Sequence, residues 1–230
     1  TYTRNEAMTR VAAIDCGTNS IRLLVADGHI GEDGRPHLAD LTRQMRIVRL
    51  GQGVDARGYL DPAAISRAVE ATVEYQRMIE KLGATCIRFV ATSATRDASN
   101  SAEFVRQIKA VIGVEPEVVV GTQEASLSFR GAVGGLGESL PGPMLVVDIG
   151  GGSTELVLGS TSVKQAISID MGAVRVTEKF FMHVDPAGGV PAADQERAIA
   201  WIDEQLDIAE KSVDLARVRS LVGVAGTVTT

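Results

Sequence analysis

Two short segments of this chain follow the same pattern, and their repetition restricts the folds that the chain can adopt. The segments are residues 13–20 (AIDCGTNS) and residues 147–154 (VDIGGGST). Each starts with apolar strand residues, continues with Asp-x-Gly and a small polar loop, and leads into a second apolar strand. Matching positions recur at one constant offset: Asp15 with Asp148, Gly17 with Gly150, and Ser20 with Ser153. The repeat predicts two similar domains, each with a β-hairpin whose turn faces a shared cleft.

The residue types in these two turns suit a phosphate group and its metal ion. Backbone N–H groups in glycine-rich and hydroxyl-rich turns converge on anions, and glycine lets the backbone approach closely. The carboxylates of Asp15 and Asp148 can hold Mg²⁺, which bridges to phosphate oxygens. A single Asp-x-Gly-x-x-Ser is weak evidence, because ordinary turns look the same. Two copies in register favour a phosphate site over two ordinary hairpins.

The composition excludes several classes of protein. The hydrophobic fraction of 45% and the charged fraction of 23% are ordinary for a soluble globular chain of 230 residues. No apolar run approaches the roughly 20 residues that a membrane-spanning helix needs, and the polar residues 1–10 lack the apolar core of a signal peptide. Cys16 and Cys86 are too few for a disulfide framework, which favours a cytoplasmic location.

The net charge of −6 argues against broad nucleic-acid binding, which requires a basic face. It is compatible with a polyanionic substrate held by a few arginines and backbone amides. One modest basic stretch contains Arg35, Arg43, Arg46, Arg49 and Arg57. We interpret this stretch either as a track for such a substrate or as a solvated pair of strands, and the sequence favours neither.

Strand and helix patterns alternate along the chain, as in an α/β fold. The helix that follows Asp61-Pro62 has the clearest signals, with an N-cap aspartate, a proline at its first position and Gly83 at its end. Further helices are predicted near 102–112, 123–133, 172–182 and 194–209. Strands are predicted at 11–14, 21–26, 38–50, 86–91, 118–120, 144–147, 155–158, 163–169 and 221–224.

The segment from Gly134 to Pro143 is rich in glycine and proline, and it is the best candidate for a domain boundary. It divides the chain into residues 8–133, which contain the first loop, and residues 134–230, which contain the second. Met8 is a candidate natural start. The last predicted strand leads into Ala225-Gly226-Thr227, a pattern that usually precedes a helix, so we expect the natural protein to continue beyond Thr230.

Seven segments together carry a resemblance to a known family. They are residues 13–23 (AIDCGTNSIRL), 49–54 (RLGQGV), 91–98 (ATSATRDA), 121–125 (GTQEA), 147–156 (VDIGGGSTEL), 172–175 (GAVR) and 223–227 (GVAGT). The chain resembles the exopolyphosphatase and guanosine pentaphosphate phosphatase family, within the superfamily of actin, sugar kinases and heat-shock chaperone ATPases. The resemblance implies an α/β fold of two actin-like (ribonuclease H-like) domains with a phosphate-binding cleft between them.

The resemblance also implies a reaction, the hydrolysis of the terminal phosphoanhydride of inorganic polyphosphate with Mg²⁺, or alternatively Mn²⁺, as cofactor. Glu124 would then align and deprotonate the attacking water. The family usually has two adjacent glutamates, and this chain has Gln123 in place of the first. Taken without the resemblance, Glu124 is a first-turn glutamate favoured by the helix dipole. The expected metal ligands are Asp15, Asp148 and Glu155.

The resemblance further implies that Arg22 and Arg96 bind phosphate oxygens, since a guanidinium can donate two hydrogen bonds to one phosphate. The alternative is an ion pair between the domains, with Asp97 or Glu155. Arg175 is either a third phosphate contact or a helix-surface arginine. The turn residues expected to lie against phosphate are Gly17, Thr18, Asn19, Ser20, Gly150, Gly151, Gly152, Ser153, Gly226 and Thr227.

Four functions fit these residues. The first is an exopolyphosphatase, and the second is the same chemistry on guanosine pentaphosphate. The third is a sensor that binds guanosine tetra- or pentaphosphate without turnover, which Gln123 leaves open. The fourth, an ATP-dependent sugar kinase, fits Glu124 and the Gly-Gly-Gly-Ser turn less well. The resemblance suggests a homodimer, no nucleic-acid or membrane partner is expected, and Cys16 is interpreted as a small buried residue rather than a nucleophile.

Overall fold

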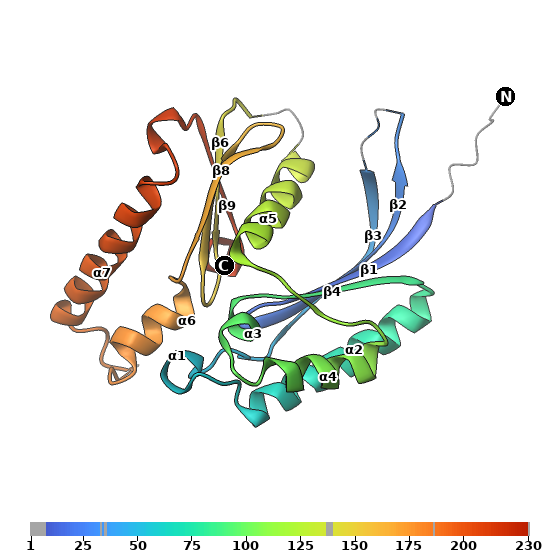
Figure 1. Cartoon of the computed structure of the whole chain (residues 1–230), viewed down its shortest axis with the longest axis horizontal. Coiled ribbons are helices and arrows are strands. Elements are labelled where there is room, and N and C mark those ends of the chain that lie inside the picture. The colour runs from blue at the N-terminus through green and yellow to red at the C-terminus, as the bar shows by residue number, and fades with distance from the viewer. Residues whose placement is uncertain (1–7, 33, 35, 137–139, 186, 230) are drawn as a thin grey trace.

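A computed structural model describes residues 8–32, 34, 36–136, 140–185 and 187–229, and it contains two sheets with their own helices (Figure 1). The first sheet has five strands in the order β3-β2-β1-β4-β5. Their bounds are β1 (Thr9–Cys16), β2 (Ser20–Ile30), β3 (Pro36–Ile47), β4 (Cys86–Ala91) and β5 (Glu117–Val118). β1 runs antiparallel to β2 and parallel to β4, so its last residues lie in the middle of the sheet.

Two helices, α2 (Pro62–Leu82) and α4 (Ser101–Ile112), cover one face of this sheet (Figure 1). α2 begins as the sequence predicts, because the Asp61 carboxylate accepts a hydrogen bond of 2.9 Å from the backbone N–H of Ala63. Buried and exposed residues alternate along β1, so that Ile14 and Cys16 point toward the helices and Asp15 points to the opposite face. Cys16 is therefore a buried residue, as predicted.

Two short helices differ from the sequence-based expectation. α1 (Val54–Arg57) forms within residues 51–58, and α3 (Ser93–Asp97) directly follows β4; the sequence analysis predicts no helix in either place. Gly53 and Gly58 flank α1 with positive φ angles of 71° and 73°, which explains why a glycine-rich segment closes into a single helical turn. α3 carries Arg96 beside the end of the first sheet.

The second sheet has four strands in the order β8-β7-β6-β9. They are β6 (Met144–Ile149), β7 (Thr154–Gly159), β8 (Val163–Ile169) and β9 (Ser220–Val224). α5 (Gly121–Leu136) packs on one face through Ala125 and Phe129. α7 (Ala192–Glu210) packs on the other face, where the hydrophobic cluster includes Trp201 and Leu206. The remaining helical turns are α6 (Ala173–Val176), a π-helical turn at Thr177–Phe181, a 3₁₀ turn at Leu215–Arg217, and α8 (Gly226–Thr229).

The two halves repeat one topology. In each, a first strand pairs antiparallel with the next strand and parallel with a later one: β1 with β2 and β4, and β6 with β7 and β9. This confirms the predicted α/β fold with two related sheets.

The packing of α5 bears on the predicted domain boundary. α5 belongs to the core of the second sheet, although the boundary predicted at residues 133 and 134 assigns it to the first domain. This packing groups α5 with the second sheet. Residues 137–139 of the predicted boundary segment lie outside the described residues, as does Arg35. No helix in the described part of the chain is long and apolar enough to cross a membrane.

Candidate active site

A cavity of about 590 Å³ lies between the open face of the first sheet and α5. Its wall contains four residues that the sequence analysis selects: Asp15 on β1, Arg22 on β2, Glu124 on α5 and Asp148 on β6. The volume is in the range of sites that bind small molecules. The folding of two distant hairpins and one helix therefore brings Asp15, Glu124 and Asp148 to one cavity, whereas the predicted metal ligand Glu155 is not among its lining residues.

The two hairpins position their charged side chains by the same register. Asp15 lies opposite Arg22 across β1 and β2, and Asp148 lies opposite Glu155 across β6 and β7. Residues that lie directly opposite one another share a face of the sheet. Although Asp15 is open to the cavity, the protein around it removes much of its solvation, and this raises the pKa of Asp15; Arg22 opposes the rise and Asp148 adds to it.

Glu124 lies in the first turn of α5 and faces the cavity. Burial raises the pKa of Glu124 to about 7; Arg96, whose Nη1 lies 3.4 Å from the Glu124 Oε2, opposes this rise, and Asp15 and Asp148 add to it. The neighbouring Gln123 instead accepts a hydrogen bond of 3.3 Å from the backbone N–H of Val120 through its Oε1. Of these two adjacent positions, only the glutamate therefore lines the cavity.

Glu155 is almost completely buried, with 1% of its surface exposed. Burial raises the pKa of Glu155 to about 8, Glu124 raises it further, and hydrogen bonds from Ser168 and Ser153 oppose the rise. The Ser168 hydroxyl donates to Glu155 Oε1 at 2.7 Å. At neutral pH, Glu155 therefore holds a proton unless a cation lies beside it.

Ser128 is a site residue that the sequence analysis missed. Its hydroxyl donates a hydrogen bond of 2.6 Å to Asp148 Oδ2, and it lines the cavity. Ser128 follows Glu124 by four residues, so both lie on one face of α5. That helical spacing is the signal that would have identified it.

The two glycine turns are packed against each other at the closed end of the cleft. Thr18 Oγ1 lies 2.9 Å from Ser93 Oγ, and both side chains are buried. A Cβ atom on Gly152 would lie 2.7 Å from Thr18 Oγ1 and 2.8 Å from Ser93 Oγ. Gly151 also packs closely on Thr18. Only glycine fits at this junction, and the Thr18 hydroxyl pairs with Ser93.

The other predicted turn residues hold the turns together. The backbone N–H of Gly17 donates to the Ser20 carbonyl, and that of Gly150 donates to the Ser153 carbonyl. The Asn19 carbonyl accepts from two later backbone N–H groups. Among the described residues that line the large cavity, none comes from these turns or from Gly226 and Thr227 at the start of α8, because the turns close on each other.

Arg96 and Arg175 take part in ion pairs. Arg96 Nη1 donates to the Val119 carbonyl at 3.1 Å, and Arg96 Nε lies 3.7 Å from Asp97. Arg175 pairs with Asp55 at 2.6 Å and Asp97 at 3.1 Å and donates to the Gly152 carbonyl at 2.9 Å. The interpretation of Arg175 as a helix-surface arginine is therefore wrong, since this side chain connects the two halves of the molecule.

The carboxylates near the cavity do not form a complete cation site, but two of them could hold a cation together. Within the described residues, no three His, Cys, Asp or Glu side chains form a ready-made metal site. Asp15 and Asp148 nevertheless share the cavity wall, and the Asp148 charge raises the pKa of Asp15. Mg²⁺ in phosphoryl-transfer sites is usually held by one or two carboxylates, waters and the substrate itself. Two carboxylates beside a solvent-accessible cavity fit that pattern.

Comparison with known proteins adds independent findings. The model of the Ppx/GppA phosphatase family matches residues 29–230. The chain is 48% identical over 229 residues to exopolyphosphatase 2 of Mycobacterium tuberculosis, covering 97% of this chain and 70% of that protein. It is 33% identical over 223 residues to a bifunctional 3-dehydroquinate synthase/phosphatase of Fusobacterium nucleatum, covering 95% of this chain and 33% of that protein.

Two solved structures have the same fold. An exopolyphosphatase-like protein superposes with a TM-score of 0.89 at 43% identity, over 96% of this chain and 67% of that chain. An exopolyphosphatase from Cytophaga hutchinsonii superposes with a TM-score of 0.83 at 30% identity, over 95% of this chain and 67% of that chain.

Proposed function

Because this chain belongs to the Ppx/GppA phosphatase family, we propose that it is an exopolyphosphatase, which hydrolyses the terminal phosphoanhydride of inorganic polyphosphate and releases phosphate. The observation that carries the proposal is Glu124, which shares the cavity with Asp15 and Asp148 and has a pKa of about 7. A carboxylate with a pKa near neutrality suits general-base catalysis. The 48% identity to exopolyphosphatase 2 of M. tuberculosis supports the choice of substrate.

In this proposal, the Glu124 carboxylate accepts a proton from water while the water oxygen attacks the terminal phosphorus. The bond between that phosphorus and the bridging oxygen breaks, and the shortened chain leaves with the bridging oxygen. Arg22 on the cavity wall donates hydrogen bonds to phosphate oxygens and neutralises their charge. Arg96 orients Glu124 through their contact of 3.4 Å. Such chemistry needs positioning and charge neutralisation more than covalent catalysis.

We further propose that Asp15 and Asp148 hold Mg²⁺, with Mn²⁺ as an alternative, and that Glu155 contributes when it loses its proton. The cation would neutralise negative charge on the substrate phosphates. Ser128 keeps the Asp148 carboxylate in place by its hydrogen bond of 2.6 Å. The buried Glu155 lies opposite Asp148 in the hairpin register.

The comparisons favour polyphosphate over guanosine pentaphosphate, since the relative with 48% identity bears the name of the polyphosphate enzyme. Hydrolysis of guanosine pentaphosphate is therefore an outcome for the assay to exclude. A cytoplasmic location, a homodimer and the absence of nucleic-acid and membrane partners stay predictions from the sequence.

The test is release of phosphate from inorganic polyphosphate and from guanosine pentaphosphate in the presence of Mg²⁺, with wild-type protein and Glu124→Gln. We expect release mainly from polyphosphate and its loss in the variant, because the amide cannot accept the proton. Glu103→Gln is a matched control, since Glu103 is also a first-turn glutamate but lies on α4. Near-normal turnover by Glu124→Gln would refute the role of Glu124, and release mainly from the nucleotide would refute the choice of substrate.

A further inference from the structure

The open face of the first sheet carries two parallel rows of side chains. The register of β3, β2, β1 and β4 places opposite residues in line across the sheet. The inner row, next to the acidic groups, is Met45, Arg22, Asp15 and Val90, and the outer row is Arg43, Leu24, Ala13 and Arg88. All eight residues line the large cavity. The cavity thus extends along the sheet from the acidic groups to two arginines.

The outer row lies two residues along the strands from the inner row, which corresponds to about 7 Å. Arg43 and Arg88 are three strand spacings apart, so their backbones are separated by about 14 Å. Between them the row contains only Leu24 and Ala13, neither of which carries a charge. An anionic chain that leaves the acidic end of the cavity across this face would meet a guanidinium on either side.

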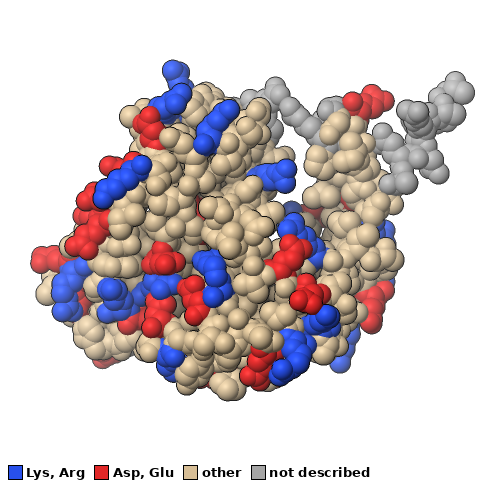
Figure 2. Space-filling view, viewed as in Figure 1, with Lys and Arg blue, Asp and Glu red and all other residues tan. Residues whose placement is uncertain are grey.

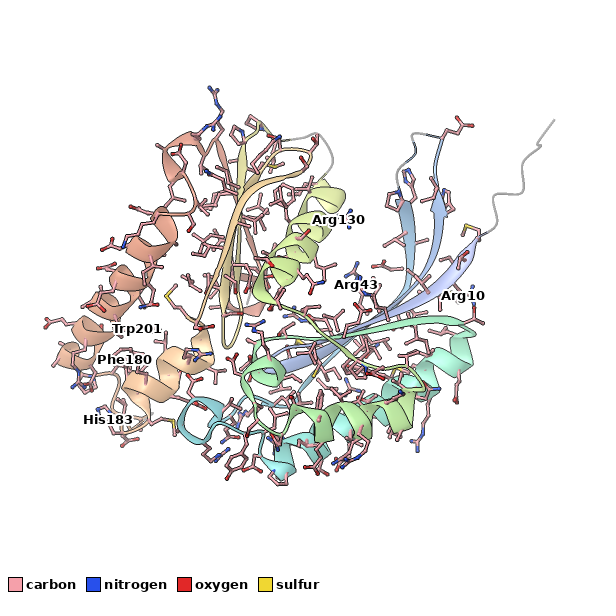
Figure 3. All side chains as sticks on the ribbon, viewed as in Figure 1. Arg10, Arg43, Arg130, Phe180, His183 and Trp201 are labelled. Atoms are coloured by element: carbon pink, nitrogen blue, oxygen red, sulfur yellow. The ribbon has the colours of Figure 1, made fainter. Side chains whose placement is uncertain are left out.

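On the other side of the gap, α5 carries Arg130, which lies outside the residues that line the cavity. Figure 3 shows Arg43 on the sheet side and Arg130 on the α5 side of the gap between them. Figure 2 shows Lys and Arg side chains on both walls of the groove that separates the two halves in this view. The acidic cavity end, where Asp15, Glu124 and Asp148 lie, is therefore followed by an outer end lined by the guanidinium groups of Arg43 and Arg88.

The present partners of these arginines are exchangeable. Arg43 pairs with Asp40, and their side chains are 70% and 39% exposed. Arg88 forms hydrogen bonds of 3.0 Å and 2.7 Å with Glu117, and both side chains are 50% exposed. Exposed ion pairs contribute little to stability. A phosphate group that competes for Arg43 would displace one exposed ion pair, and one that competes for Arg88 would exchange the two hydrogen bonds of Glu117 for two of its own.

The wider basic stretch does not share this placement. Arg46 follows Arg43 by three residues on β3, but its guanidinium reaches Glu74 of α2 on the opposite side of the sheet. Arg57 donates to the Gln52 carbonyl and lies near Asp61. Of these arginines, Arg43 is the one that lines the cavity.

We propose that the outer row is a subsite for the phosphate groups that follow the terminal one, with Arg43 and Arg88 as its ligands. This proposal rests on the proposed function, since it requires that the terminal phosphate binds at the acidic end. A chain long enough to reach the outer row gains contacts that a short chain lacks. The subsite therefore gives the enzyme a higher kcat/KM for longer chains than for tripolyphosphate.

The test compares kcat/KM for long-chain polyphosphate and tripolyphosphate in the wild type and in the Arg43→Ala/Arg88→Ala double variant. We expect the ratio of the two values to fall by roughly tenfold or more, because each guanidinium contributes charge-assisted hydrogen bonds to the long chain alone. Arg46→Ala is the matched control, since it removes a positive charge from the same strand on the opposite face, and its ratio should equal that of the wild type. An unchanged ratio in the double variant would overturn the proposal.

A binding measurement separates failure of the subsite from failure of the proposed function. Long-chain polyphosphate is titrated into the wild type, the double variant and Arg46→Ala by calorimetry. If the wild type releases no phosphate from any chain, the proposed function is wrong. Weaker binding by the double variant alone would still support the anion subsite, whereas equal binding by all three proteins would overturn it. Thermal unfolding checks that the variants fold.

Discussion

The contact between Arg96 and Glu124 makes the activity depend on pH in a predictable direction. Burial raises the pKa of Glu124 to about 7, and Arg96 opposes that rise. Below this pH the carboxyl group holds its proton and cannot accept another from water, so kcat/KM should increase as the pH rises through 7, where it is half-maximal, and level off at higher pH. Arg96→Met removes the opposing charge and should move this rise to higher pH. The measurement is the pH profile of kcat/KM for both proteins.

Arg96→Lys is the control, because it keeps a positive charge beside Glu124. Its profile should lie closer to the wild type than that of Arg96→Met, even if both variants bind substrate less well. A rise at the same pH in the wild type and in Arg96→Met would contradict the assignment of Glu124 as the group that titrates.

Ser128 gives a second prediction, for the binding of Mg²⁺. Its hydroxyl donates to Asp148 Oδ2 at 2.6 Å, and loss of a group that orients a metal ligand typically weakens metal binding. In Ser128→Ala we expect the apparent affinity for Mg²⁺ to fall by roughly tenfold, and in Ser128→Thr we expect it to be largely kept. The readout is the rise in melting temperature as Mg²⁺ is titrated in without substrate. Identical titrations for Ser128→Ala and the wild type would exclude this role.

The junction of the two glycine turns predicts a large effect from one methyl group. A Cβ atom on Gly152 would lie 2.7 Å from Thr18 Oγ1 and 2.8 Å from Ser93 Oγ, so Gly152→Ala must displace these hydroxyl groups or the turns that carry them. Since a shift of about 1 Å in a catalytic site costs on the order of a hundredfold in rate, we expect a comparable loss of phosphate release and a lower melting temperature. Gly131→Ala is the control: it makes the same change on α5, where nothing lies within 4 Å of the added atom. If Gly152→Ala and Gly131→Ala released phosphate at the same rate, the added methyl group at residue 152 would not disturb the site, and the prediction would be wrong.

The strands and helices were largely predictable because their signals are local. The repeated hairpins follow from alternating apolar residues and Asp-x-Gly turns, and α2 follows from Asp61, Pro62 and Gly83. The packing partner of α5 was not predictable, since apolar residues such as Phe129 show that a helix is buried but not which sheet buries it.

The candidate site was predictable to a similar degree. Asp15, Arg22, Glu124 and Asp148 stand in recognisable motifs, and the structure brings all four to one cavity. Ser128 and Ser168, which donate to Asp148 and Glu155, stand in no motif, and Ser168 reaches Glu155 only through the pairing of β7 with β8.

Beside the two glycine turns, polar contacts of α6 and the turn that follows it join the two halves of the molecule. Arg175 of α6 in the second half pairs with Asp55 and Asp97 of the first. Next to it, Glu178 accepts a hydrogen bond of 2.8 Å from the backbone N–H of Gly53. These contacts lie beside Thr18 and Gly152 of the two turns, so we expect them to help hold the cavity walls at a fixed distance.

Arg175 therefore links stability to activity. Its side chain is 18% exposed, and its removal leaves Asp55 without its partner and Asp97 with Arg96 alone, so Arg175→Met should lower the free energy of unfolding. In a double-mutant cycle with Asp55→Asn, we expect a coupling energy of about 1 kcal/mol, measured by urea unfolding with Trp201 fluorescence and circular dichroism.

Phosphate release by Arg175→Met should fall as well, because the walls that carry Arg22 and Glu124 are no longer held together. Lys164→Met, which removes an exposed positive charge from β8, should change neither quantity. Additive effects of Arg175→Met and Asp55→Asn would mean that this ion pair does not connect the two halves.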